Sequence, residues 1–291
     1  MKMLGTLRPF VDPASRAVNR TFPLDGVDLL SLPDESLATL LDSAPALYDF
    51  GQTTVVRLSK DLVMKGGGNV LPCEAEALRI VASKPGIRAP RVHRSFQLTD
   101  DSKYFGTMGY IVMDYIHGQP LDTCWEDLGD EQKSDVSKQV AEMIMEMQCI
   151  KLPKPGPIQG GPCRGRFFTH YSAGPFNNES EFEDWFNHKL DICQKFNKAP
   201  QDTPRFKFTE FVLTHQDVSP RNLILDQHGQ AWLVDWADAG AYPPAFETAA
   251  LSSQQSFPEF NARVLSHLPR YPLEERQLDS IGYALTTAAL A

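Results

Sequence analysis

The chain has 291 residues, enough for one large domain or for two lobes that each bury a core. Its composition, 42% hydrophobic and 22% charged with no biased tract, excludes a disordered or fibrous protein. The 28 basic residues face 37 acidic ones, and this net charge of -9 argues against a nucleic-acid partner, which requires a basic surface. An acidic balance is compatible with a cationic substrate, or it serves solubility alone.

Cysteine usage and hydropathy bear on where the protein works. The five cysteines are scattered and form no CxxC pair, which favours a reducing compartment without a zinc or disulfide framework. No stretch approaches the ~18 apolar residues that a membrane span needs. We therefore expect a cytoplasmic protein with no membrane partner.

The amino-terminal part of the chain predicts a helix and then a β-hairpin. A polar start followed by apolar spacing predicts a helix near residues 33–41. A β-branched run over 53–58 and an apolar run over 62–65 predict two strands joined by a polar turn. This hairpin places Lys65 at a strand end.

A second helix and a connector follow the hairpin. Glycines at 66–68 break the strand, and apolar residues at helical spacing predict a helix over 74–83. Residues 87–92 are extended around a proline, and 110–113 form an apolar strand that leads into a connector. Small-lobe sheet gives way to a second region here.

The second half of the chain is mainly helical, with short strands and a long loop. The pattern predicts, in chain order, a helix beginning near 129–131, a loop over 152–178, a helix around 182–190, a strand at 211–213, a hairpin of strands 222–225 and 231–234, and helices from 246 onward. Loops as long as the predicted one are usually functional or mobile.

The strongest chemical signal is an HxDxxxxN pattern that begins at His215. It contains Asp217 and Asn222, and the predicted hairpin that follows it ends at Asp235. Phosphoryl transfer leaves a protein little covalent work, so catalysis rests on orienting the nucleophile and neutralising phosphate charge with Mg²⁺. Oxygen ligands from an asparagine and an aspartate suit that hard cation.

These parts, in this order, resemble the aminoglycoside phosphotransferase and choline kinase family, which shares its catalytic apparatus with protein kinases. The resemblance covers about residues 48–250. It implies an α+β, bilobal, protein-kinase-like fold with an antiparallel sheet in a small N-terminal lobe and a larger, mainly helical C-terminal lobe. The implied domains are a lead-in and helix over 1–47, a nucleotide-binding N-lobe over 48–115, and a catalytic, substrate-binding C-lobe over 116–291.

The resemblance also implies roles for single residues, with ATP and Mg²⁺ as cofactors. Asp217 is the expected catalytic base for a substrate hydroxyl, and Asn222 and Asp235 are the expected magnesium ligands. Lys65 is expected to hold the α- and β-phosphates. Glu76 is expected to fix Lys65 through an ion pair.

The nucleotide side departs from protein kinases, because no GxGxxG precedes Lys65. Only the segment around Gly51 can form a nucleotide-covering turn, with the glycine allowing close backbone approach. Small-molecule kinases of the family often lack the glycine triplet. The resemblance assigns further nucleotide contacts to Met113 and Tyr115, at the connector near 114–116.

Some assignments have competitors. Glu74 lies in the first turn of the same helix as Glu76, which is preferred because it falls in register when counted back from the family-like segment 87–90. His215 is expected to hold the loop by hydrogen bonds, although a histidine general base is the alternative. Arg221 either adds positive charge near the phosphates or pairs with a structural acid.

Two further features qualify the resemblance. Gln216 stands where the family commonly has glycine, and its longer side chain is expected to narrow the space beside the base. The segments Gly161-Pro162-Cys163, Gly174-Pro175-Phe176 and Asp235-Trp236 resemble the fungal branch of the family. Substrate specificity in the family resides in the helical lobe and in the 152–178 segment, so the acceptor stays open.

The first functional hypothesis is an ATP-dependent kinase that phosphorylates a hydroxyl of a small molecule, such as an amine-bearing, cationic one. The alternative is a catalytically inactive kinase-like module that binds a nucleotide or metabolite, suggested by the missing glycine triplet. Nucleotidyl transfer or protein phosphorylation on the same scaffold is a third hypothesis. Neither composition nor spacing decides among them.

Overall fold

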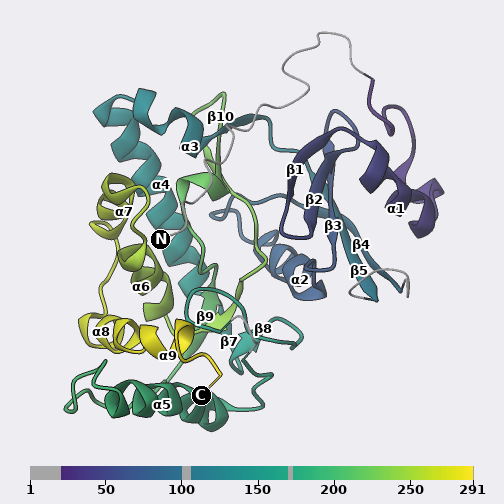
Figure 1. Ribbon diagram of the computed structural model, residues 1–291. Coiled ribbons are helices and arrows are strands. Elements are labelled where there is room, and N and C mark those ends of the chain that lie inside the picture. The colour runs from purple at the N-terminus through teal and green to yellow at the C-terminus, as the bar shows by residue number, and fades with distance from the viewer. Residues whose placement is uncertain (1–20, 100–105, 170–172, 291) are drawn as a thin grey trace.

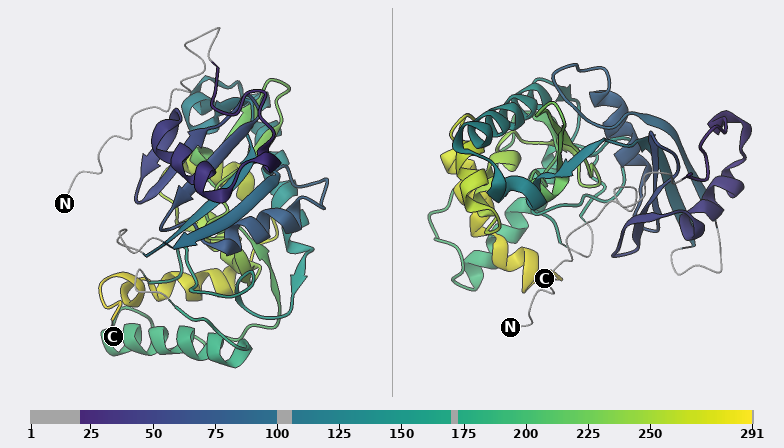
Figure 2. Two further views of the ribbon diagram at one scale, coloured as in Figure 1. Left: turned by 90° about the vertical axis from the view of Figure 1, so that its right-hand side faces the viewer. Right: turned by 90° about the horizontal axis from the view of Figure 1, so that it is seen from above.

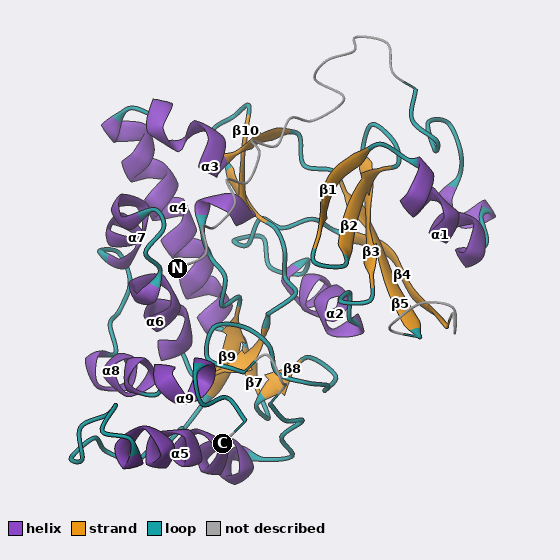
Figure 3. Ribbon diagram, viewed as in Figure 1, coloured by secondary structure: helices purple, strands orange, loops and turns teal. Residues whose placement is uncertain are grey.

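The computed structural model describes residues 21–99, 106–169 and 173–290 of the chain. One lobe is built on an antiparallel sheet and the other mainly on helices (Figure 1, Figure 3). The view from above separates the two lobes in the same way (Figure 2). The α+β, bilobal architecture predicted from the sequence is confirmed. Within the described ranges, no helix is both long and apolar enough to cross a membrane.

A five-stranded antiparallel sheet with the order β1-β2-β3-β5-β4 forms the N-lobe. Its strands are β1 (Ala46–Phe50), β2 (Thr53–Arg57), β3 (Leu62–Gly67), β4 (Val92–Thr99) and β5 (Thr107–Asp114). The central strand β3 pairs with β2 on one side and β5 on the other, so that Lys65 lies opposite Val55 and Ile111. Neighbouring backbones therefore hold this lysine from both sides.

Each face of the N-lobe sheet has its own helix. Met64 of β3 belongs to the apolar cluster of Leu37 in α1 (Asp34–Ser43), whereas Val63 belongs to the cluster of Leu78 in α2 (Pro72–Val81). Successive strand residues point to opposite faces, so Lys65 shares the face of Val63. The alternation of β3 thus directs Lys65 toward α2.

The C-lobe is a group of helices around two apolar clusters. Its α-helices are α3 (Leu121–Cys124), α4 (Asp130–Gln148), α5 (Glu179–Lys195), α6 (Ala245–Ser253), α7 (Pro258–Leu265), α8 (Pro272–Ser280) and α9 (Gly282–Thr286). The long helix α4 packs against α7, and its apolar residues join the same cluster as α2 of the N-lobe. The second cluster is rich in phenylalanine and lies between α5, α6 and α9.

Two small sheets carry the loops that face the N-lobe. The first has the order β11-β10-β6, from β6 (Gly118–Pro120), β10 (Leu223–Asp226) and β11 (Ala231–Leu233). The second has the order β7-β9-β12-β8, from β7 (Lys151–Leu152), β8 (Gly156–Pro157), β9 (Phe211–Thr214) and β12 (Gly240–Tyr242). Because β9 and β10 belong to different sheets, the segment that joins them runs from one sheet to the other.

Most predicted elements are confirmed, with shifted ends. The hairpin of 53–58 and 62–65 is β2 and β3, and the helix predicted over 74–83 is α2, which begins two residues earlier. The strands β1 and β4 lie outside the predicted elements. β1 is mostly exposed, and β4 carries polar residues such as His93 and Arg94, so neither shows the apolar pattern of a buried strand.

Candidate active site

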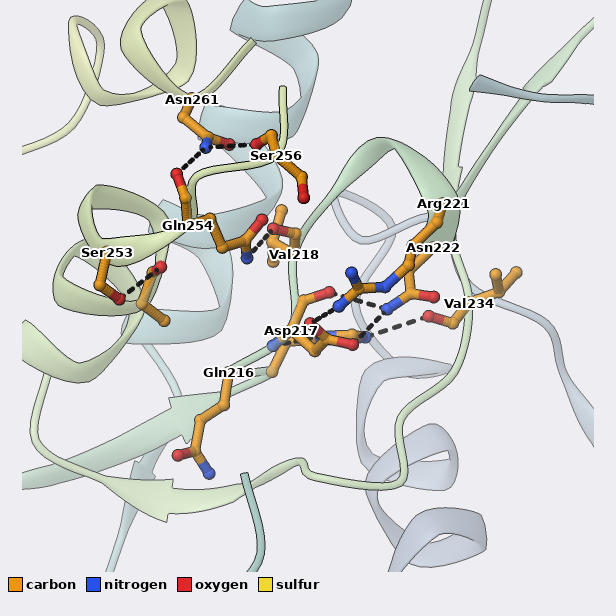
Figure 4. A network of polar contacts seen from close by, with 12 residues as sticks. Gln216, Asp217, Val218, Arg221, Asn222, Val234, Ser253, Gln254, Ser256 and Asn261 are labelled. Atoms are coloured by element: carbon orange, nitrogen blue, oxygen red, sulfur yellow. Dashed lines mark hydrogen bonds and ion pairs between the residues drawn. The ribbon is translucent and has the colours of Figure 1, made fainter. Parts of the chain in front are cut away.

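The segment between β9 and β10 holds the HxDxxxxN residues in one tight loop, which ends in a 3₁₀ turn over Pro220–Asn222. Asn222 Nδ2 donates to Asp217 Oδ2 at 2.8 Å and to the Asp217 carbonyl at 2.9 Å. Arg221 pairs with the other oxygen of the same carboxylate, Oδ1 (Figure 4). Of the two roles open for Arg221, the structure has it paired with an acid, and that acid is the expected base itself.

Lys65 joins the two lobes at the site. Its Nζ donates to Glu74 Oε1 and to Asp235 Oδ1, each at 2.7 Å. Burial alone would lower the pKa of Lys65, but the charges of Glu74 and Asp235 outweigh it and raise that pKa. The lysine is therefore a fixed cation held between a helix of one lobe and a loop of the other.

Asp235 follows β11 and stands in an unusual backbone conformation, with φ of 61°. A non-glycine residue at positive φ is uncommon and marks a position that the surroundings enforce. Burial would raise the pKa of Asp235, but the charge and hydrogen bond of Lys65 lower it. Its side chain is still 48% exposed, so the ionised carboxylate is open to solvent.

The predicted ion pair between Lys65 and Glu76 is wrong. Glu74 makes it, and Glu76 instead pairs with Arg79 on the outer side of α2. Positions 74, 77, 78 and 81 share one helical face, and that face is the buried one. The same spacing that predicted the helix therefore selects Glu74, and the missed signal is present in the sequence.

His215 is a buried support of the loop. Its ring Nδ1 lies 3.3 Å from the Asp217 N–H and accepts from it, which leaves Nε2 to donate to the Val234 carbonyl at 3.1 Å. Burial lowers the pKa of His215 and keeps the ring neutral. Both ring nitrogens are engaged with the backbone, so the histidine holds the loop as predicted and has no nitrogen left for a general base.

Glu247 of α6 holds the backbone of the loop between β9 and β10 in place. Its carboxylate accepts from the His215 N–H at 2.6 Å and from the Gln216 N–H at 3.1 Å. Burial raises the pKa of Glu247 to about 7, against the lowering effect of these two hydrogen bonds. A single acid in the apolar run Ala245–Leu251 was the signal for a buried partner.

A second support reaches the loop from the segment after α6. Gln254 Nε2 donates to the Val218 carbonyl at 3.0 Å, and Asn261 Nδ2 donates in turn to the Gln254 carbonyl at 3.1 Å (Figure 4). These bonds connect α7 to the residue next to Asp217. Sequence patterns did not single out either amide.

Gln216 bridges segments and does not narrow the site as expected. Its Nε2 donates to the Asp238 carbonyl at 2.8 Å and to the Arg164 carbonyl at 3.2 Å, so the side chain lies buried beneath the loop.

Burial and the charges of Asp217 and Asp235 raise the pKa of Asp238 to about 6. Three carboxyl groups from one segment and its neighbouring loop thus lie within electrostatic reach of one another.

The sequence of the chain matches the model of a known family. The model of the phosphotransferase enzyme family matches residues 68–279. The chain belongs to the phosphotransferase enzyme family. No curated protein matches the chain in sequence.

Solved structures similar to this phosphotransferase include aminoglycoside phosphotransferases. The streptomycin–ATP ternary complex of APH(2'')-IIa has 16% identity and a TM-score of 0.55, over 86% of either chain. ADP-bound aminoglycoside phosphotransferase APH(2'')-Ib and aminoglycoside phosphotransferase APH(4)-Ia each have 15% identity and a TM-score of 0.55, over 88% of this chain and 92% of theirs. At such identities the similarity establishes the protein-kinase-like fold.

The predicted magnesium ligands of the phosphotransferase fit a cation by their chemistry. Asn222 commits Nδ2 to Asp217, which leaves its Oδ1 available, and Asp235 commits Oδ1 to Lys65, while the Ala237 backbone also hydrogen-bonds to the Asp235 carboxylate. Across the described residues, no group of three or more His, Cys, Asp or Glu side chains is arranged to hold a metal. A cation here would need further oxygens from phosphates and water, which is how Mg²⁺ is usually held.

The predicted nucleotide contacts of the phosphotransferase lie in the N-lobe and its connector. Gly51 and Gln52 form the two-residue turn between β1 and β2, both at positive φ. Met113 is buried near the end of β5. The guanidinium carbon of Arg57 lies 3.1 Å from the centroid of the Tyr115 ring. The Tyr115 N–H donates to the Asp61 carbonyl at 2.8 Å. The Tyr115 backbone donor is therefore already used.

Proposed function

We propose that this protein transfers the γ-phosphoryl group of ATP to a hydroxyl of a small molecule. The observation that carries the proposal is the meeting of Lys65 from the N-lobe with Asp235 of the C-lobe, beside the Asp217–Asn222 pair. Grouped charges of this kind suit a transfer in which the protein mainly positions reactants and offsets phosphate charge. Membership of the phosphotransferase family supports the same chemistry.

In the proposed reaction, Asp217 accepts the proton of the acceptor hydroxyl. A bond forms between the acceptor oxygen and the γ-phosphorus, and the bond from that phosphorus to the β–γ bridging oxygen breaks. The products are a phosphomonoester and ADP. The Asp217 side chain is 27% exposed, which leaves it accessible to an acceptor that displaces Arg221 or binds beside it.

The nucleotide would lie between the lobes. Lys65, held in place by Glu74, would contact its α- and β-phosphates, and the turn at Gly51 would cover them. Met113 and Tyr115 would border the base. Mg²⁺ held by Asn222 and Asp235 would neutralise phosphate charge when bound.

We propose a cationic acceptor on electrostatic grounds. Asp217, Asp235 and Asp238 lie within reach of one another, and the whole chain is acidic. Some of the similar solved structures are complexes with streptomycin, gentamicin or kanamycin. Those ligands belong to those proteins, and for this chain they define the first acceptors to try.

An inactive nucleotide-binding module is the second candidate, because Arg221 occupies one oxygen of the expected base. ADP release with Mg-ATP and a panel of aminoglycosides, amino alcohols and sugars distinguishes the two. We expect one acceptor class to raise ADP release above background in the wild-type protein.

Replacing the base is the sharper test. We expect Asp217→Asn to lower turnover by about 10³-fold, the range of a lost general base, while ATP affinity measured by calorimetry stays within about threefold. Asp191→Asn, a change to an exposed acid on α5, serves as the matched control. Equal turnover in Asp217→Asn and wild type would exclude Asp217 as the base.

A further inference from the structure

A line of hydrogen bonds connects the turn at Gly51 to the loop that carries Asp217. Asn69 Nδ2 donates to the Gly51 carbonyl at 2.7 Å. Arg164 Nη1 donates to the Asn69 carbonyl, also at 2.7 Å. The Arg164 carbonyl then accepts from Gln216 Nε2 at 3.2 Å. Two of these residues belong to the N-lobe region and two to the C-lobe, so the line connects the two lobes.

The N-lobe end of this line is fixed by close packing. Gly67, near the end of β3, has φ of 147°, and a Cβ on it would lie 2.0 Å from the Gln52 carbonyl oxygen. Only glycine allows the turn to approach β3 so closely. The neighbouring strand β1 brings Tyr48 within electrostatic reach of Asp235 and Lys65, so the β1–β2 hairpin extends over the site.

The C-lobe end is equally constrained. Gln216 is buried beside Asp217 with φ of 66°, and its backbone is held by Glu247. A Cβ on Gly165 would lie 3.0 Å from Gln216 Oε1, so the backbone around Gly165, in the 152–178 insert, lies directly against this side chain. Any displacement of the insert near Arg164 would therefore disturb the residue next to the expected base.

Arg164 is the member of the line that crosses between the lobes by its side chain. Its guanidinium comes from the 152–178 insert, and its acceptor is a main-chain carbonyl just after β3. A charged donor makes a stronger hydrogen bond than a neutral one, so the loss of this contact has a measurable effect.

We propose that Arg164 is a positioning residue that holds the Gly51 turn over the triphosphate of ATP and couples that turn, through Gln216, to the loop of Asp217. The inference rests on the proposed function, since it requires a nucleotide beneath the turn. It gives a reason for the hydrogen bond from Arg164 of the C-lobe to the opposite lobe. Binding at either side of the cleft would then help to order the other side.

The test is ATP affinity in the absence of any acceptor, measured by calorimetry with Mg-ATP. We expect Arg164→Met and Asn69→Ala each to weaken binding about tenfold, which corresponds to the loss of one strong hydrogen bond. The double variant should be little weaker than either single one, because both changes interrupt the same line. Arg164→Lys, which keeps the charge, should recover part of the loss.

Adenosine separates positioning from general damage, because it has no phosphates for the turn to cover. We expect Arg164→Met to bind adenosine with the affinity of wild type. As a control, Arg205→Met removes an exposed guanidinium that pairs with Asp191 of α5, and we expect it to bind ATP like wild type. Asn69→Ala, at a half-exposed position, keeps the test available if the arginine variant does not fold.

The outcomes separate the two proposals. A wild-type protein that binds no nucleotide overturns the proposed function and this inference with it. Wild-type protein that binds ATP, with Arg164→Met and Asn69→Ala binding it equally well, overturns the inference alone. An equal loss of adenosine and ATP affinity also contradicts it, because a phosphate-covering turn cannot produce that result.

Discussion

At the scale of single residues, Lys65 keeps its charge in a place where burial acts to lower its pKa. Two carboxylates stabilise the ammonium, and one of them, Glu74, is itself buried. Burial raises the pKa of Glu74, while the charge of Lys65 opposes that rise. Removing one member of such a buried group leaves an uncompensated charge, which is more costly than losing an exposed pair.

The difference in cost between breaking a buried ion pair and an exposed one distinguishes Glu74 from Glu76 on α2. We expect Glu74→Gln to weaken ATP binding at least tenfold, because Lys65 loses the partner that orients it. The exposed pair of Glu76 with Arg79 contributes little, so Glu76→Gln should change the affinity less than about twofold. Calorimetry with Mg-ATP on both variants decides the matter. A larger loss in the Glu76 variant would reverse the assignment.

The residues that could be predicted from the sequence are those whose spacing is local. Asp217 and Asn222 lie five residues apart in one loop, and they meet as expected. Glu74 was the less favoured of two candidates because register was counted from a distant segment, although the buried face of α2 identifies it. Glu247 was not placed against the loop because its partners are backbone groups, which leave no side-chain signature.

At the scale of elements, α6 supports the loop that carries Asp217. Its Glu247 replaces water as the acceptor for two N–H groups of a loop that belongs to no regular element at that point. A carboxyl with a raised pKa binds its proton more tightly in the folded state than in the unfolded one. Its contribution therefore makes the folded state less stable as pH rises from 4.5 to about 7.

A pH series on Glu247→Gln measures this contribution. Wild type should lose up to about 3 kcal/mol of unfolding free energy relative to the variant between pH 4.5 and pH 7.5. The comparison cancels His215, whose lowered pKa has the opposite effect on stability below pH 6.5. Urea unfolding at several pH values supplies the data. A difference between the two proteins that stays constant with pH would show that Glu247 does not titrate in this window.

The aromatic cluster between α5 and α6 is the other element-scale feature. Phe182 of α5 is fully buried and packs against Phe186, Phe211 and Phe246. We expect Phe182→Ala to lower the free energy of unfolding by about 3–5 kcal/mol through the cavity it leaves.

Phe196 supplies the matched control, because it lies just beyond α5 and is 48% exposed. The change Phe196→Ala should cost less than about 1 kcal/mol. Urea unfolding measures both values. Equal costs for the two changes would mean that the cluster does not hold α5 in place.

Long periodic elements could be predicted, whereas β1 and β12 could not. The helices α4 and α5 carry apolar residues at helical spacing over many turns. The strand β12 has three residues and pairs with β9, which is distant in the chain, so its pairing is a tertiary property that no local pattern records. The strand β1 pairs with the adjacent β2, but it is largely exposed and lacks the apolar pattern of a buried strand.

At the scale of the whole molecule, the site exists only where the two lobes meet. Lys65 and Asp235 are 170 residues apart, and their contact follows from the order of motifs in the family rather than from any local pattern. The Arg164–Asn69 hydrogen bond is another contact between the lobes, and it has no counterpart in the sequence motifs. The family resemblance therefore gives the arrangement of the lobes, while the contacts that lock them require the structure.

The central claim is that Asp235 and Asn222 face a metal-bound triphosphate that Lys65 holds from the other lobe. The most direct measurement is ATP affinity by calorimetry with and without Mg²⁺, in wild type and in Asp235→Asn. We expect Mg²⁺ to strengthen ATP binding at least tenfold in wild type and less than about twofold in the variant. An equal effect of Mg²⁺ in the two proteins, or no binding of ATP to wild type, would contradict the account.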